Sequence, residues 1–153
     1  MRKYSSAKDT KKHIRKVRGY LFKIIWELFK RALSHDKTKL SRKEKPVFDI
    51  YTPKLKETTY GSPEYSKYLK EMDVALSHHY AKNRHHPEHF INGVKGMNLV
   101  DITEMFCDWL AATKRHADGN IFVSIAKNKN RFNYETIQAF IFNNTAYMLG
   151  EME

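Results

Sequence analysis

The sequence predicts an all-α fold, a single compact helical domain of five to seven helices spanning residues 1–153. Apolar residues recur at three- and four-residue steps in several long stretches, which is the spacing of one helix face. Proline, glycine and capping residues separate these stretches. With 153 residues, of which 41% are hydrophobic, the chain is long enough to bury one sizeable core.

The first predicted helix covers residues 7–34, and its apolar face consists of Ile14, Val17, Leu21, Ile24, Leu28 and Leu33. His13 lies near the start of this helix, and His35 follows its end. A continuous helix would hold these two histidines about 33 Å apart. They can share a metal site only if the helix breaks, and Gly19 is the one local candidate for a break.

The middle of the chain carries two helix-start signals. Ser41 and Glu44 have capping-box spacing, but Pro46 allows only a short helix there, and we expect residues 46–61 to form a connecting loop. Ser62-Pro63-Glu64 is a clearer start, with a hydroxyl N-cap and proline at the first helical position. From there one stripe at spacings of four and three contains Tyr65, Leu69, Met72, Leu76 and His79.

Two further helices are predicted in the last third. One begins near Asn98 and runs to about Ala117, with Gly119 placed to end it. The run at 121–126 is too short to distinguish a strand from a helical turn. Asn133 is then the expected N-cap of the last helix.

Positive charge is concentrated in the first third of the chain. The formal charge is +11, and residues 1–45 hold 16 Lys and Arg against 4 Asp and Glu, a net of +12. This segment could attract phosphate-bearing ligands or nucleic acid, although a solvated helix face explains it equally well. Residues 1–12 are a candidate flexible segment.

Several classes of protein are excluded or disfavoured by the sequence. No apolar stretch reaches the length needed to span a bilayer, and no secretory signal is recognisable, so we expect no membrane partner. The single Cys107 cannot form an internal disulfide, which suits the cytoplasm, and its apolar context favours a structural thiol. No glycine-rich phosphate loop and no cysteine pair for a zinc finger is present.

Five of the eight histidines lie between Ser77 and His89. This concentration of imidazole indicates a metal or proton-transfer site. His79 continues the core-facing stripe and is the better ligand candidate, whereas His78 points about 100° away. The alternative for His79 is a core histidine that donates to a backbone carbonyl. We expect His85 and His86 to lie on a turn that presents them to the site, and His89 to lie outside it.

The helix that follows offers two acidic candidates. Asp101 could be a ligand, but it could also be the acid of a capping box begun at Asn98, or itself the N-cap paired with Glu104. Asp108 lies in mid-helix, where aspartate has poor helix propensity. The two residues are two turns apart, about 10.5 Å, so they need not serve one metal.

The order of these residues resembles the HD-domain metal-dependent phosphohydrolases, helical proteins that bind one or two divalent metals. His35-Asp36-Lys37-Thr38-Lys39 is similar to the HD-x-G-K segment of the HD-GYP branch, with Thr38 in place of the glycine. His85-His86 resembles that branch's paired histidines, and Asp101 its final aspartate. The GYP triplet is absent, so a cyclic dinucleotide substrate does not carry over. Over nearly its full length, the chain also resembles a family of uncharacterised phage and bacterial proteins.

The HD resemblance implies a set of metal ligands, a catalytic pair and a class of metal. The implied ligands are His13, His35, Asp36, His79, His85, His86 and Asp101, and the implied catalytic residues are Asp36 and Lys39. Imidazole and carboxylate ligands suit one or two ions of Fe, Mn, Co, Ni or Zn. Asp36 would bridge two metals or orient the attacking water, and Lys39 would contact the substrate phosphate.

We expect a metal-dependent phosphohydrolase, of nucleotidase or phosphodiesterase type, that acts on a nucleotide or another phosphate ester in the cytoplasm of a bacterium or a phage-infected host cell. Two alternatives remain. One is a non-catalytic protein that binds nucleic acid or a host partner through the basic segment. The other is an HD-type di-iron oxygenase using the same ligands.

Overall fold

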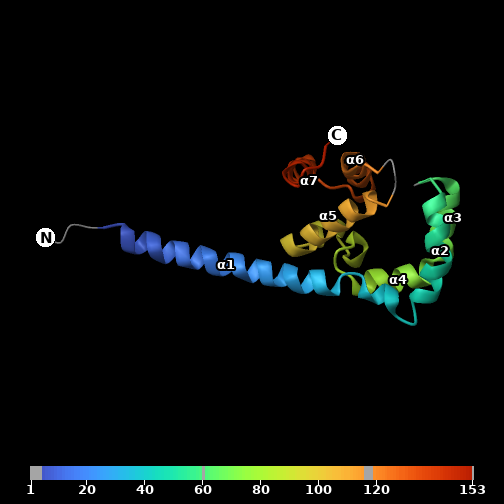
Figure 1. Cartoon of the computed structure of the whole chain (residues 1–153), viewed down its shortest axis with the longest axis horizontal. Helices are drawn as coiled ribbons and strands as arrows, with labels where there is room; N and C mark the ends of the chain where they lie inside the picture. The colour runs from blue at the N-terminus through green and yellow to red at the C-terminus, as the bar shows by residue number, and fades with distance from the viewer. Residues whose placement is uncertain (1–4, 60, 116–118, 153) are drawn as a thin grey trace. The chain divides into compact units, whose positions relative to one another are not determined.

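The computed structural model describes residues 5–59, 61–115 and 119–152, and every regular element in these ranges is helical (Figure 1). The all-α prediction is therefore confirmed for this part of the chain. The α-helices are α1 (Ala7–Ser34), α2 (Lys45–Glu57), α3 (Pro63–Glu71), α4 (Asp73–Lys82), α5 (Leu99–Thr113), α6 (Ile121–Phe132) and α7 (Thr136–Met148). Three short 3-10 helices join them: η1 (Lys37–Leu40), η2 (Pro87–His89) and η3 (Gly93–Gly96).

Helix α1 is a unit by itself. Contacts between Cα atoms divide the chain at Ser34, with the second unit beginning at His35. The 28 residues of α1 form one uninterrupted helix that continues through Gly19, and none of them is buried. The core of the predicted domain therefore belongs to the segment after Ser34. Residues 7–12 of the candidate flexible segment are helical, and residues 1–4 lie outside the described ranges.

The larger core of the second unit lies among α5, α6 and α7. Its buried residues are Val94, Met105, Phe106, Ile121, Ile125, Tyr134, Phe142 and Ala146. The rings of Phe106 and Phe142 stack with centroids 5.5 Å apart. The Tyr134 hydroxyl donates to the carbonyl of Ile125 at 2.7 Å, so its polar end is satisfied within the core. This three-helix core holds α5 in place and, with it, the acidic side chains discussed below.

A second group of helices lies earlier in the same unit. Helix α3 contacts both α2 and α4, and η1 contacts α2 and α4. Met72 and Ala75 are buried there at the α3–α4 junction. These contacts place η1, which begins directly after Asp36, against the helix that carries His79.

The predicted loop at 46–61 is wrong, because residues 45–57 form α2. Pro46 lies in the first turn, where its missing N–H has no helical partner to lose, and Pro53 is accommodated inside the helix. The capping signal upstream was partly correct, since the Ser41 hydroxyl accepts from the Glu44 backbone N–H at 3.3 Å. The Glu44 side chain, however, points elsewhere.

Other boundaries also differ from the prediction. The stripe from Tyr65 to His79 is split between α3 and α4, which meet at Met72. Residues 121–126 belong to α6, and Asn133 ends that helix in a left-handed conformation instead of starting α7. The Asn98 N-cap is confirmed, but α5 ends at Thr113, and Ala117 lies outside the described residues. No helix among the described residues is sufficiently long and apolar to cross a bilayer.

Candidate metal centre

Four short segments of the second unit bring imidazoles and carboxylates together. The turn after α1 supplies His35 and Asp36, and α4 supplies His79. The loop between α4 and η2 supplies His85 and His86, and α5 supplies the acids. Segments more than 60 residues apart in the sequence thus meet at one place.

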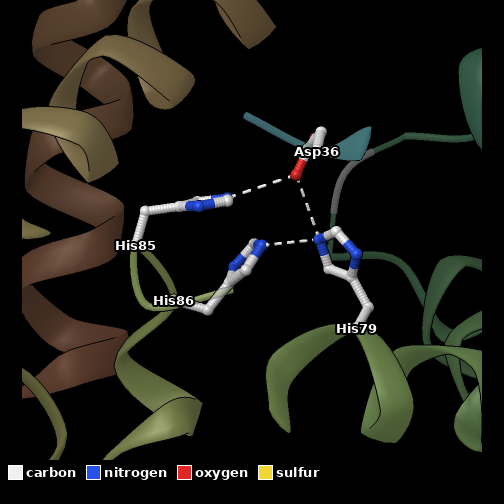
Figure 2. A group of neighbouring side chains, drawn as sticks. All are labelled: Asp36, His79, His85 and His86. Atoms are coloured by element: carbon white, nitrogen blue, oxygen red, sulfur yellow. Dashed lines mark hydrogen bonds and ion pairs between the residues drawn. The ribbon is translucent and has the colours of Figure 1, made fainter. Parts of the chain in front are cut away.

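Asp36, His79, His85 and His86 form the first group, in which one ligand atom from each residue lies within 4.8 Å of the others. Figure 2 shows their side chains pointing toward one another. The Oδ1 atom of Asp36 lies 3.2 Å from His79 Nε2 and 3.4 Å from His85 Nε2. The two Nε2 atoms of His79 and His86 are 2.9 Å apart. Three imidazoles and one carboxylate are a donor set typical of transition-metal sites.

Two atoms at the centre of this group are buried without a hydrogen-bond partner. They are Asp36 Oδ1 and His85 Nε2. Leaving a buried polar atom unsatisfied costs about 1–3 kcal/mol, so native proteins rarely do so without a reason. Both atoms are Lewis bases and face each other, so a cation between them would satisfy both.

Glu44 orients His79 from behind. This carboxylate is fully buried, and its Oε2 lies 2.9 Å from His79 Nδ1 and accepts from the Thr38 hydroxyl at 3.0 Å. Its Oε1 lies 2.7 Å from Nδ1 of His78. A carboxylate accepts from Nδ1 of both rings, and this contact turns Nε2 of His79 toward Asp36, where that nitrogen is placed to bind a cation.

Glu104 has the same role for two other histidines. Its Oε1 lies 3.0 Å from His35 Nδ1 and 3.2 Å from His85 Nδ1. The unsatisfied Nε2 of His85 therefore faces the first group while Nδ1 donates to the carboxylate. One ligand atom from each of His35, His85 and Glu104 also lies within 4.8 Å of the other two. We assign Glu104 an orienting role because both imidazoles present Nδ1 to it and Nε2 to Asp36.

A second group of possible ligands lies on the other side of the Asp36 carboxylate. His35 Nε2 is 3.6 Å from Asp36 Oδ2 and 3.6 Å from Asp108 Oδ1. Lys39 Nζ donates to the same Asp36 Oδ2 at 2.5 Å. Asp36 thus presents Oδ1 to one group and Oδ2 to the other, an arrangement in which one carboxylate can bridge two cations. Asp36 has φ 55° and ψ 12°, in the left-handed region that few non-glycine residues adopt.

The electrostatics of the metal-free site favour ionised acids. Burial raises the pKa of the Asp36 carboxyl, but the His79 and His85 imidazoles and the Lys39 ammonium lower it by more, so the net pKa is well below its usual range. Burial also raises the pKa of the Asp108 carboxyl, but the hydrogen bond to His35 and the charges of His85 and Lys39 together lower it by more. Both carboxylates are therefore available as anionic ligands at neutral pH.

The histidines divide into those whose pKa is raised, His35 and His85, and one whose pKa is lowered, His86. Hydrogen bonds to Asp108 and Glu104 raise the pKa of His35 to about 10, so this ring is protonated in the metal-free protein. Burial, together with the charges of His85 and His79, lowers the pKa of His86 to about 3. Burial lowers the pKa of His85, but Asp36 and Glu104 raise it by more. A bound cation would take the place of the protons that balance these carboxylates.

The family to which the chain belongs follows from its sequence. The model of a family of unknown function, DUF5662, matches residues 2–152. The chain belongs to DUF5662. No curated protein and no solved structure matches it. These comparisons supply no link to the HD-domain phosphohydrolases, and that resemblance stays a prediction.

Asp101 lies outside the ligand groups, which corrects one predicted ligand. It is fully buried and accepts two hydrogen bonds from Arg84, at 3.1 and 2.9 Å. It also closes a capping box with Asn98 at the start of α5. Its carboxylate thus fixes the residue preceding His85 against α5, a positioning role. Asp108, the alternative that the sequence left open, is the aspartate beside His35.

His13 is also removed from the predicted set. It lies on α1 21 residues before Ser34, and that helix is unbroken. A rise of 1.5 Å per residue places it about 32 Å along the helix from Ser34, whose neighbour His35 belongs to the site. The same chain therefore cannot bring His13 to the other ligands.

Sequence reasoning missed the orienting residues Glu44, Glu104 and Thr38. The sequence predicts only a capping role for Glu44, and Thr38 stands out there only as a departure from the HD-x-G-K pattern. In the structure Thr38 donates to Glu44 and accepts from Asn83 at 2.8 Å.

Two histidines were predicted to lie outside the site. His78 is one of them, and it shares Glu44 with His79. His89 donates to the Tyr80 carbonyl at 2.9 Å, consistent with a structural role. Two signals in the sequence could have pointed to Glu44: its position next to a helix start, and the adjacent pair His78-His79, which needs an acceptor.

Proposed function

We propose that this protein is a metal-dependent phosphohydrolase in which Asp36, His79, His85 and His86 hold a divalent transition metal. The observation that carries the proposal is the pair of buried, unsatisfied atoms, Asp36 Oδ1 and His85 Nε2, within the group of four. The acids behind the imidazoles support it, because Glu44 and Glu104 direct ligand nitrogens toward the same place.

The donor types narrow the choice of metal. Neutral imidazole nitrogens with a carboxylate oxygen suit Zn, Fe, Mn, Co or Ni better than Mg or Ca, which prefer all-oxygen sites. His35, Asp36 and Asp108 would hold a second ion, with Asp36 shared between the two. When bound, such ions activate water at neutral pH and neutralise charge on phosphoryl oxygens.

The substrate class that we propose is a nucleotide or another phosphate ester. Lys39 is the cationic side chain nearest to the shared carboxylate, with Nζ 2.5 Å from Asp36 Oδ2. Its ammonium also lies 5.3 Å from the centre of the Phe48 ring, which holds the lysine next to the site. In this role Lys39 would exchange its contact with Asp36 for a substrate phosphate oxygen if a cation were bound on the Oδ2 side.

Elemental analysis of the purified protein tests the metal site. We expect about one or more equivalents of transition metal in the wild-type protein, a strong loss in His85→Ala, and no loss in His13→Ala. His13→Ala is a matched control because it removes an imidazole from α1, outside the ligand groups. Equal metal content in all three proteins, or no uptake by wild type after incubation with Zn, Mn, Fe, Co or Ni, would contradict the proposal.

Hydrolysis assays test the activity separately. We expect wild-type protein loaded with metal to release phosphate from p-nitrophenyl phosphate, bis(p-nitrophenyl) phosphate or a panel of nucleotides. Asp108→Asn should reduce turnover by at least tenfold because it removes a charged ligand of the second group. Metal binding without hydrolysis of any of these substrates would support the proposed metal site and contradict the proposed phosphohydrolase activity. Bound iron with an oxygen-dependent absorbance change would then favour the di-iron alternative.

A further inference from the structure

Helix α1 presents an apolar surface that nothing in its own unit covers. In this helix, all of whose residues the structure describes, ten large apolar side chains are 40–65% exposed. They are Ile14, Val17, Tyr20, Leu21, Phe22, Ile24, Ile25, Trp26, Phe29 and Leu33. Monomeric soluble proteins rarely expose contiguous apolar patches above about 300–600 Å². The helix therefore requires a partner.

The spacing of these residues is that of a helix–helix seam. Ile14, Val17, Leu21, Ile24 and Leu28 follow one another at steps of three, four, three and four, and we call them the α1 seam. This is the a and d pattern of a coiled coil, in which side chains of one helix insert between those of another. The opposite side of the helix carries Trp26 and four lysines, Lys12, Lys16, Lys23 and Lys30, and we call these lysines the α1 polar face.

The exposed area is large enough for a stable pairing of two chains. Counting 100° per residue, six of the ten residues lie within about 80° of the middle of the α1 seam: Ile14, Val17, Tyr20, Leu21, Ile24 and Ile25. Taking roughly 200 Å² for each large side chain, half-exposed on average, these six present on the order of 600 Å². Two such surfaces together bury about 1,200 Å², which is the lower end of the range for specific interfaces. Because a second copy of the chain offers the same seam with the same spacing, the surface is self-complementary in the way that a two-fold interface requires.

Charge determines the direction of the pairing. Residues 8–18 contain six Lys and Arg and one Asp, a net charge of +5. A parallel pair would hold two such segments side by side on helix axes about 8–10 Å apart. Their basic side chains project away from the α1 seam, so part of the repulsion is screened in physiological salt, where the screening length is about 8 Å. An antiparallel pair places each segment against residues 27–34 of the second copy, where one Glu, one Lys and one Arg give +1. Antiparallel pairing thus avoids most of the repulsion.

We infer that the protein forms a two-fold dimer in which α1 pairs antiparallel with α1 of a second copy through the α1 seam. The inference does not depend on the proposed function, since it concerns residues outside the ligand groups. The basic segments then lie at opposite ends of the paired helices.

Light scattering after size-exclusion chromatography of the full chain tests the dimer. Wild type should have twice the chain mass of 18.1 kDa, and Leu21→Glu/Ile24→Glu should fall to a single chain mass. Lys16→Ala/Lys23→Ala changes the net charge by the same two units on the α1 polar face and should remain a dimer. Circular dichroism verifies that both variants stay helical. If the seam variant is unfolded, Leu21→Ala/Ile24→Ala replaces it, with at least a tenfold weaker dimer expected.

Spin-label distances test the direction. With Cys107→Ser removing the native thiol, a label can be attached at Thr10→Cys, which continues the α1 seam four residues before Ile14. It should report a separation above about 30 Å between copies if the helices are antiparallel, and well below that if they are parallel. A wild-type protein that is monomeric at tens of micromolar overturns the inference. So does a monomer that sediments with phosphatidylglycerol vesicles, since a bilayer would then be the occupant of the apolar surface. A dimer unchanged by the seam variants also overturns it.

Discussion

Glu44→Gln is the substitution that best separates an orienting carboxylate from a purely structural one. Glu44 is fully buried, and its two oxygens contact Nδ1 of His78 at 2.7 Å and Nδ1 of His79 at 2.9 Å. Glutamine has nearly the same shape but only one acceptor oxygen, and its NH2 group can only donate. One of the two imidazoles must then face a donor.

The expected consequence is a change in which nitrogen of His79 carries the proton. If the amide NH2 faces His79, Nδ1 becomes the acceptor and the proton moves to Nε2, the atom that lies 3.2 Å from Asp36 Oδ1. Metal binding must then displace that proton. Loss of such an outer carboxylate typically lowers metal affinity by about 10–100-fold. This range corresponds to roughly 1.4–2.7 kcal/mol of binding free energy.

Competition against a chelating dye measures this change, and nitrogen-15 chemical shifts of the His79 ring report the protonated nitrogen. Glu64→Gln is the matched control, because Glu64 is exposed and accepts from the Tyr68 hydroxyl on α3. A Glu44→Gln protein that is folded and binds metal within twofold of wild type would refute the reasoning. It would mean that Glu44 only satisfies buried donors.

Three further predictions concern the surrounding residues. Asp101→Asn should lower the free energy of unfolding by about 1–3 kcal/mol, because it removes the charge of a fully buried acid that accepts from the partly exposed Arg84. The Asp101→Asn variant should retain bound metal, whereas Asp108→Asn should lose metal with a smaller effect on stability. Chemical denaturation and metal analysis of both variants check this. In metal-free protein the pKa of His35 is about 10, against an ordinary value of 6.5, so its contribution to stability is complete below about pH 6.5 and is lost as the pH rises toward 10. Urea midpoints should therefore fall from pH 6 to pH 10, and a decline of equal size in metal-loaded protein would count against His35 as a ligand. Thr38→Val should destabilise the protein by about 1–3 kcal/mol, because Glu44 loses a donor and Asn83 loses an acceptor, and a melting temperature equal to that of wild type would contradict this.

Local signals predicted the helices well where a single chemical feature determined them. The Ser62 hydroxyl accepts from the Tyr65 N–H at 3.1 Å, as its position before Pro63 indicated. The capping box at Asn98 is present for the same reason. Helix α2 was missed because proline has opposite effects in the first turn and in the interior, and its tolerance at Pro53 depends on surroundings that lie outside the segment.

The site could be predicted only as far as helical phase and motif order extend. Phase placed His79 on the buried face, where it is 1% exposed. The choice between Asp101 and Asp108 needed the position of Arg84, which satisfies the first of them. Glu104 meets His35 across 69 residues of sequence, and no local pattern encodes such a contact. The candidate ligands were therefore recognisable from phase and motif order, and the acids behind them were not.

The left-handed backbone at Asp36 affects how mutations at this position should be interpreted. Alanine there would lose the carboxylate and also adopt a conformation that costs an L-residue about 1–2 kcal/mol, so reduced activity in that variant would combine two causes. Asparagine tolerates the conformation and isolates the loss of charge. Glycine adopts it freely, and thermal melts of the metal-free proteins should rank Asp36→Gly above Asp36→Ala. At the centre of its candidate site the fold thus keeps Asp36, although glycine would suit the backbone there better. Selection for chemistry and selection for stability oppose each other at this position.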